Sequence, residues 1–181
     1  VTEIKLDQLR SNIALVPQEG YLFTETLSDN IRYGNPEASI SKVKASAYEA
    51  RMSEDIKGFP DGLKTLVGER GITLSGGQRQ RTALSRALLV ESKLIVLDDA
   101  LASVDNKTAS AILQTIKNQY SKTVIMISHQ LSAAASCDRI LVMDEGKIVQ
   151  EGTHQALINK NGLYKSMWER EKAKEQLQSD D

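Results

Sequence analysis

The sequence predicts an α/β fold with a mainly parallel sheet, because short apolar strands alternate with stretches of helical periodicity. The strand candidates are Ile13–Val16, residues 94–97 and Thr123–Ile127. Residues 21–89 are mostly helical in pattern, so we expect a helical insert between the first strand and the second. The helical stretches between later strands act as crossover connections, which is why the sheet is expected to be parallel.

The 181 residues suffice for one domain with a core and a small subdomain. The formal net charge of −1 provides no global attraction to nucleic acid, so we expect no nucleic-acid partner. The single cysteine, Cys137, cannot form an internal disulfide. No apolar run approaches the length of a membrane helix. The sequence opens at Val1 without a methionine, and we interpret it as part of a longer chain.

Helix signals and turn residues define the insert. In residues 24–32, Leu27 and Ile31 share a face, which predicts a short helix. Ser39 is a candidate cap for a second helix over residues 40–52. Residues 58–62 and 67–71 are expected to be loops, and residues 1–10 show no clear pattern.

After residue 97, predicted helices alternate with predicted strands. Asp105 is a candidate cap for a helix reaching about residue 120, and a short helix is expected over residues 131–136. Residues 140–143 and 147–151 flank Asp144-Glu145-Gly146, which predicts a hairpin. Thr153 can cap a helix to residue 159, and residues 163–176 predict a last amphipathic helix.

A small-residue turn precedes a helical stretch at Ser75, Gly76, Gly77 and Gln78. Glycines let a ligand approach the backbone closely, and a helix N-terminus directs free N–H groups at an anion. The serine hydroxyl can add a donor to a phosphate oxygen. The alternative is a tight turn and helix cap, the more frequent meaning of Ser-Gly-Gly alone.

Two carboxylates, Asp98 and Asp99, end the buried strand over residues 94–97. A carboxylate fixed there can hold Mg²⁺, and its neighbour is where a general base for an attacking water would lie. The alternative is an acidic strand end that simply meets solvent.

Two further polar residues follow predicted strands. His129 follows Thr123–Ile127 and could donate to a γ-phosphate or orient a water, although a single histidine is more often structural. Gln18 follows Ile13–Val16 and could reach a magnesium ion or a water; otherwise it is a turn residue after proline. His154 and Cys137 are expected to be structural.

Together these motifs resemble the ATP-binding cassette (ABC) ATPases. LSGGQRQR at residues 74–81 resembles their signature motif, LIVLDD at 94–99 their Walker B strand, and ALASVD at 100–105 their D-loop. Gln18 matches the Q-loop glutamine and His129 the switch histidine. VPQEGYLFTETLSDNIRYG at 16–34 and VGERG at 67–71 are similar to the exporter branch, in which the helical insert faces coupling helices of the membrane domain.

The resemblance implies a P-loop NTPase (RecA-like) fold with a helical signature subdomain, incomplete at the N-terminus. It divides the chain into residues 1–20 with the Q-loop, 21–90 as the helical subdomain, 91–165 as the core, and 166–181 as a C-terminal helix and tail. It implies a nucleotide-binding domain that binds and hydrolyses ATP at the cytoplasmic face of the cell membrane and drives export.

The resemblance also implies the role of each site residue. Asp98 and Gln18 would hold Mg²⁺, and Asp99, His129 and Gln18 would be catalytic. Asp105 belongs to the D-loop. In the family two cassettes pair head to tail, so the signature residues would bind ATP held by the partner cassette: Ser75, Gly76, Gly77 and Gln78. The implied partners are a second nucleotide-binding domain and the chain's own transmembrane domain.

The sequence departs from the family in two places. No G-x-x-x-x-G-K-[ST] occurs, so we expect this chain alone neither to bind ATP tightly nor to hydrolyse it. Asp99 stands where the family usually has glutamate, and its shorter side chain should make its own site slow. This resembles the degenerate subunit of heterodimeric multidrug exporters: the intact signature would serve the partner's site, and Asp99 would lie in the weak one.

Two other functions stay open at this level. One is an ABC ATPase with no membrane domain, such as a DNA-repair or translation factor; the other is a nucleotide-gated dimerisation module with little turnover. The transported substrate would be set by membrane helices outside this sequence, as would the direction of transport.

Overall fold

The computed structural model describes residues 3–68, 72–119 and 122–179. The chain splits into two compact units, Val1–Ser128 and His129–Asp181, and each is considered by itself. Within the described residues, no helix combines the length and the apolar character that crossing a membrane requires.

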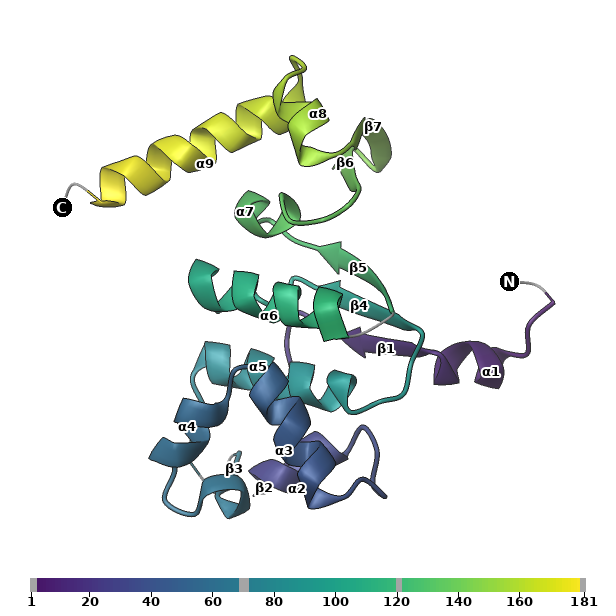
Figure 1. Ribbon diagram of the computed structural model, residues 1–181, viewed down its shortest axis with the longest axis vertical. Helices are drawn as coiled ribbons and strands as arrows, with labels where there is room; N and C mark the ends of the chain where they lie inside the picture. The colour runs from purple at the N-terminus through teal and green to yellow at the C-terminus, as the bar shows by residue number, and fades with distance from the viewer. Residues whose placement is uncertain (1–2, 69–71, 120–121, 180–181) are drawn as a thin grey trace. The chain divides into compact units, whose positions relative to one another are not determined.

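A parallel sheet forms the centre of the first unit. Its strands are β1 (Ile13–Val16), β4 (Leu94–Asp98) and β5 (Thr123–Ile127), in the order β1-β4-β5. Figure 1 shows them side by side, with β4 between the other two. Ile13 lies opposite Leu94, which lies opposite Thr123. The prediction of a parallel α/β sheet is confirmed, and the carboxyl ends of all three strands meet at one edge.

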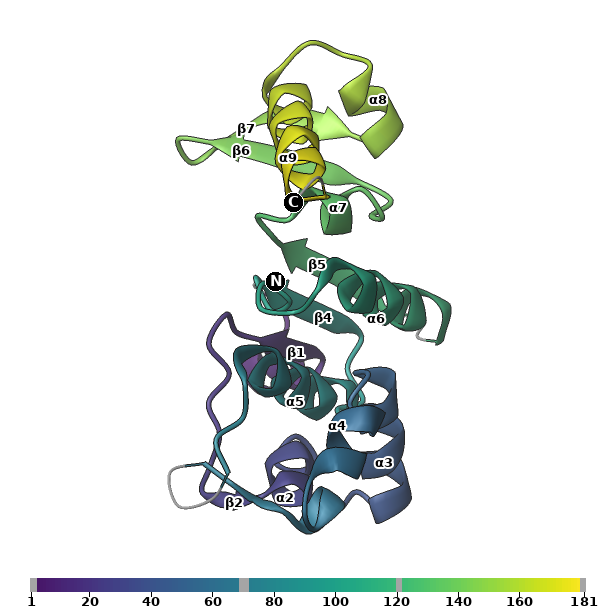
Figure 2. The same cartoon turned by 90° about the vertical axis from the view of Figure 1, so that its left-hand side faces the viewer.

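The two faces of this sheet differ in their covering. Ala14, Val16, Ile95 and Leu97 are buried on the face that packs with α5 (Gly76–Leu88) and α6 (Asn106–Gln119) (Figure 2). The intervening side chains alternate to the other face, as the two-residue period of a strand requires. There Leu15 is 59% exposed, Ile125 48% and Ile127 50%.

Ahead of α5, the described residues of the insert form four helical segments and a small antiparallel pair of strands. The helical segments are α2 (Leu27–Arg32), α3 (Ile40–Glu49), α4 (Ser53–Gly58) and the 3₁₀ turn η1 (Gly62–Lys64). The pair joins β2 (Glu25–Thr26) to β3 (Leu66–Val67). A further helix, α1 (Leu6–Ser11), precedes β1, where the sequence showed no clear pattern.

Several predictions for the insert were wrong in detail. The first helix begins at Leu27 rather than residue 24, because Glu25 and Thr26 pair with β3 and the Thr26 hydroxyl caps the helix by accepting from the Asp29 amide. The second, capped by Ser39 as predicted, ends at Glu49 because Arg51 adopts a left-handed φ of 59°. The helix α4 that follows was not predicted. In the predicted loop over residues 67–71, Val67 belongs to β3, and residues 69–71 lie outside the described residues.

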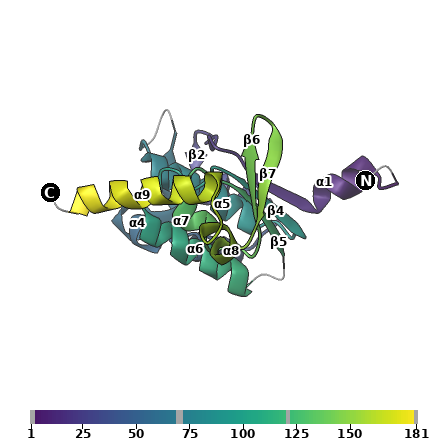
Figure 3. The ribbon, with the colours of Figure 1, turned by 90° about the horizontal axis from the view of Figure 1, so that it is seen from above.

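The second unit contains the predicted hairpin. Strands β6 (Ile140–Asp144) and β7 (Lys147–Gly152) turn at Glu145 and Gly146, both with positive φ. The helices are α7 (Leu131–Ala134), α8 (His154–Ile158) and α9 (Leu163–Ser179). Thr153 caps α8 as predicted, accepting from the Ala156 amide. α7 ends two residues earlier than predicted and α9 three residues later; Figure 3 shows α9 as one continuous helix.

Tyr164 and His154 anchor α9 in the core of the second unit. Tyr164 is 1% exposed, and its hydroxyl is 2.8 Å from Nδ1 of His154. The His154 ring also lies edge-on to Trp168, at 4.5 Å between centroids. His154 therefore has the structural role expected of it.

Alkaline pH is expected to loosen this core. Burial raises the pKa of the Tyr164 hydroxyl, so the folded state keeps a proton that the unfolded chain loses above about pH 10. The stabilisation is fully present below pH 10 and is lost as the pH rises through the folded pKa. Thermal melts of wild type and Tyr164→Phe between pH 8 and 12 check this: the phenylalanine variant should lose less stability over that range. Parallel curves would contradict it. Tyr48→Phe, at a 62% exposed tyrosine, is the control.

Candidate functional site

The N-terminus of α5 is built by a reciprocal pair of hydrogen bonds. The Ser75 hydroxyl accepts from the backbone amide of Gln78 at 3.2 Å, and Oε1 of Gln78 accepts from the backbone amide of Ser75 at 2.9 Å. This is a capping box, and it satisfies two amides that a helix start leaves unpaired. None of the hydrogen bonds found among the described residues uses the amides of Gly76 or Gly77. Those two N–H groups and the hydroxyl proton of Ser75 can therefore bind an anion.

The two glycines let α5 approach the loop after β4. A Cβ on Gly77 would lie 2.8 Å from the backbone oxygen of Ser103, and one on Gly76 would lie 3.2 Å from the Ser103 side chain. A real Cβ does not tolerate 2.8 Å from a backbone oxygen, so position 77 requires glycine unless the loop moves. The glycines thus serve packing within the chain as well as access for a ligand.

The side chain of Gln78 also contacts helix α4. Its Nε2 donates to Oδ1 of Asp55 on α4 at 3.0 Å. Arg81 binds both oxygens of the same carboxylate, at 2.9 and 3.3 Å, and donates to the backbone oxygen of Arg51. The side chains of Arg81 and Asp55 are 17% and 16% exposed, so this pair is largely shielded from water. The side chain of Gln78 is therefore engaged within the chain, and its contribution to an anion site would be indirect.

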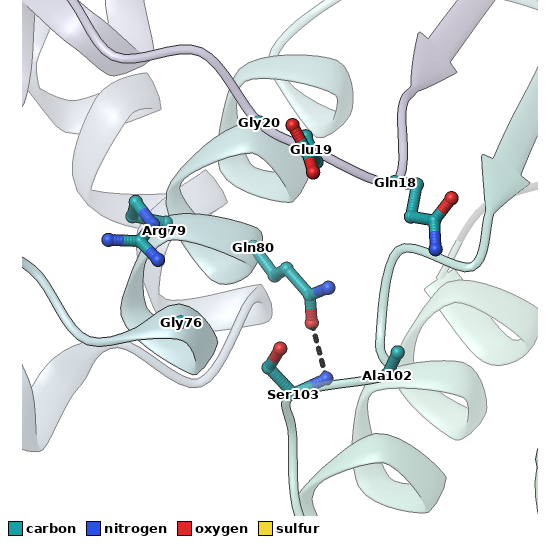
Figure 4. Close-up of a pocket in the computed structure, with 8 residues that line it drawn as sticks. All are labelled: Gln18, Glu19, Gly20, Gly76, Arg79, Gln80, Ala102 and Ser103. Atoms are coloured by element: carbon teal, nitrogen blue, oxygen red, sulfur yellow. Dashed lines mark hydrogen bonds between the residues drawn. The ribbon is translucent and has the colours of Figure 1, made fainter.

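Gln80 joins α5 to the loop that follows β4. Its Oε1 accepts from the backbone amide of Ser103 at 2.8 Å, drawn as a dashed line in Figure 4, and its Nε2 donates to the backbone oxygen of Asp99 at 3.5 Å. The side chain is buried, with Gln80 7% exposed. The side-chain amide of Gln80 thus links α5 to Asp99, the residue after β4, and to Ser103.

Asp98 ends β4 and Asp99 follows it in an unusual conformation. Asp99 has φ of 47°, a left-handed value that aspartate tolerates better than most residues. Its amide donates to the backbone oxygen of Ile127 at 2.9 Å, and its own backbone oxygen accepts from Ala102. Nε2 of Gln18 donates to Oδ2 of Asp99 at 3.4 Å. The carboxylate is therefore held at the edge of the sheet where the strands end.

Gln18 and the start of α5 line a common cleft of about 510 Å³. Figure 4 shows the side chain of Gln18 on one side of it and Gly76 on the other. The lining residues are Gln18, Glu19, Gly20, Gly76, Arg79, Gln80, Ala102 and Ser103. The fold brings Gln18, Asp99 and the turn at residues 75–78 into one region, although they are far apart in sequence.

The residues at this edge fit a magnesium ion chemically. Asp98 offers carboxylate oxygens at the end of a central strand, and Gln18 keeps its amide oxygen available while its nitrogen contacts Asp99. Carboxylate and amide oxygens are the protein ligands that Mg²⁺ accepts, usually together with water and phosphate oxygens.

Two other predicted residues take different places. Oδ1 of Asp105 accepts from the backbone amide of Thr108 at 2.9 Å, which confirms it as the cap of α6, and this bond lowers the pKa of its carboxyl group. Tyr120, the expected end of that helix, lies outside the described residues. His129 is exposed and is the first residue of the second unit, so it is considered with that unit.

Residues 1–102 match the family model for "ABC transporter". This chain belongs to the ABC transporter family. It is 44% identical over 172 residues to a probable multidrug resistance ABC transporter ATP-binding/permease protein of Bacillus subtilis, covering 94% of this chain and 29% of that protein. It is 42% identical to the mitochondrial ABC transporter B family member 24 of Arabidopsis thaliana, covering 96% of this chain and 26% of that protein.

A solved structure agrees with this assignment. A bacterial Atm1-family ABC exporter with ATP bound superposes with a TM-score of 0.89 at 38% identity, covering 94% of this chain and 30% of that one. The chain is thus an ABC transporter nucleotide-binding domain with the α/β fold of P-loop NTPases, and it spans less than a third of these three proteins.

Sequence reasoning missed Asp55, Gln80 and Ser103. One signal was available: Gln80 stands one helical turn before Leu84, on the buried face of α5, and a polar side chain there needs a partner. Nothing in the local sequence of Asp55 or Ser103 indicated their partners.

Proposed function

We propose that this chain is the ATP-hydrolysing part of an ABC exporter subunit. The observation that carries the proposal is the start of α5, where no hydrogen bond among the described residues uses the Ser75 hydroxyl proton or the amides of Gly76 and Gly77. These residues lie in a sequence that resembles the signature motif, within the part of the chain that the family model matches. The relatives include a probable multidrug resistance transporter, and the similar solved structure is that of an exporter, which favours export over a role without a membrane domain.

The site residues act on two different ATP molecules, one in this chain's own site and one held by a second cassette. Asp98 and Gln18 hold Mg²⁺ on the ATP of this chain's own site, where bound Mg²⁺ would neutralise charge on the phosphates. Asp99 takes the position of the base that accepts a proton from the attacking water, and His129 donates to the γ-phosphate. Ser75, Gly76 and Gly77 donate to the γ-phosphate of ATP held by a second cassette, while Gln78 fixes their geometry.

The proposed partners follow from that division. A second nucleotide-binding domain completes both sites by head-to-tail pairing, and a heterodimer is favoured because Asp99 makes one site weaker. The membrane domain of the same transporter contacts the helical insert, which places the chain at the cytoplasmic face of the membrane. The four-part division at residues 1–20, 21–90, 91–165 and 166–181 remains part of this proposal.

A mixing experiment tests this function. The 181-residue chain contains no P-loop lysine motif, so calorimetry should detect no micromolar Mg-ATP binding by the chain alone. Adding it to a partner cassette that carries its own P-loop should produce ATP hydrolysis, and Ser75→Arg in this chain should abolish the gain. Tight binding by the chain alone, or a gain that survives Ser75→Arg, would contradict the proposal.

The dimerisation module with little turnover is the second candidate. Asp99 favours it, because a short carboxylate at the base position lowers turnover at one site. In the mixing experiment it would appear as ATP-dependent association of the two cassettes without hydrolysis.

A further inference from the structure

The short helix α7, which begins two residues after His129, has an unusual cap. Gln130 occupies its N-cap position and its side chain makes no capping hydrogen bond. Glutamine is not among the residues that cap helices well. The backbone amides at the start of α7, which have no acceptor within the helix, must therefore find acceptors elsewhere.

Those acceptors come from α9. Oε2 of Glu171 accepts from the backbone amide of Leu131 at 3.0 Å, and Oε1 accepts from the backbone amide of Ser132 at 3.1 Å. Both oxygens of one carboxylate thus bind consecutive amides from some forty residues further along the chain. Bonds from a charged acceptor are stronger than neutral ones, and a negative charge is favourable at a helix N-terminus.

The position of Glu171 on α9 supports a specific role. Tyr164, Met167 and Trp168 belong to or pack against the core of the second unit, and Glu171 follows them at helical spacing on the same stripe. A carboxylate on a core-facing stripe is costly unless it is paired. The pairing here is with the start of α7, whose Leu131 and Ala133 are 7% and 3% exposed.

We propose that Glu171 is a positioning residue for His129. It fixes the start of α7, and through it the two-residue segment His129-Gln130 that enters the helix. The C-terminal helix would thereby control where the histidine is presented. This inference rests on the proposed function only for what His129 does. The bonds from the Glu171 carboxylate to the amides of Leu131 and Ser132, which we call the clamp, lie within the second unit.

Hydrogen exchange of the intact protein, followed by NMR, tests the clamp. Glu171→Ala should speed exchange of the Leu131 and Ser132 amides by about ten- to hundredfold, the range expected for losing a bond to a charged group. The amides of Ile140 and Val142 in β6 should be unchanged. Glu169→Ala, at an exposed glutamate two residues earlier on α9, is the control and should change nothing. Unchanged exchange at residues 131 and 132, or general acceleration across β6, would overturn the proposal.

Steady-state ATP hydrolysis in a transporter containing this chain tests the link to His129. Glu171→Gln should lower kcat several-fold while leaving KM for ATP unchanged, and Glu171→Asp should recover part of the loss. Local loosening with an unchanged kcat would overturn the link. Failure of the proposed function is distinguishable, because the wild-type transporter would then hydrolyse no ATP.

Discussion

Replacing Asp99 with glutamate is expected to raise ATP turnover at this chain's own site by about 10²–10⁴-fold, the usual value of general-base assistance. The backbone bonds of Asp99 fix its main chain at the sheet edge, and its carboxylate contacts Gln18 there. Glutamate adds one methylene and extends the carboxylate into the region beyond. The measurement is single-turnover hydrolysis in a transporter containing this chain.

The control for this change is Asp99→Asn. Asparagine tolerates the left-handed backbone at position 99 as well as aspartate does, but it cannot accept the proton. We expect Asp99→Asn to be slower than wild type and Asp99→Glu to be faster. Equal single-turnover rates for all three would show that position 99 supplies no base.

Replacing Gly77 with alanine is expected to reduce hydrolysis at the partner's site by about 10²–10³-fold, the cost of displacing a donor that stabilises developing charge. The new Cβ would lie 2.8 Å from the backbone oxygen of Ser103, so α5 or its neighbouring loop must shift. Alanine is the better helix former, and a gain of about 1 kcal/mol in helix propensity partly offsets the strain. The hydrolysis rate should therefore fall much more than the stability of the fold. The measurement is the hydrolysis rate and the thermal melting curve of Gly77→Ala and wild type, both taken on the same preparation.

Gly58→Ala is the matched control, because Gly58 also lies in a helix and a Cβ there meets nothing within 4 Å. It should leave hydrolysis unchanged. If Gly77→Ala is as harmless as Gly58→Ala, the close approach of α5 to Ser103 has no functional role.

Those features of the fold that depend on local residue patterns could be predicted from the sequence. The apolar runs predicted the three parallel strands, and Gln18 and Asp99 were each predicted to follow one of them. The carboxyl ends of parallel strands meet at one edge, which is where the structure has the contact between these two residues. Ser39, Asp105 and Thr153 cap helices as their residue types predict.

Other features depend on contacts between distant segments. Helix α4 starts after a left-handed Arg51, and the two-residue strands β2 and β3 exist only because they pair across the insert. The partners of Asp55, Gln80 and Glu171 are 19 to 40 residues away in sequence, so no local pattern indicates them.

The central claim is that one chain serves two nucleotides, with residues 75–78 facing the partner's ATP and Asp98 and Asp99 facing its own. The most direct test counts the ATP that remains intact on each transporter after one round of hydrolysis, by rapid filtration with ATP labelled at the γ-phosphate. The account predicts one retained ATP per pair of cassettes, lost faster in Asp99→Glu, while Ser75→Arg blocks hydrolysis of the other. Hydrolysis of both nucleotides at the same rate in the wild type would contradict it.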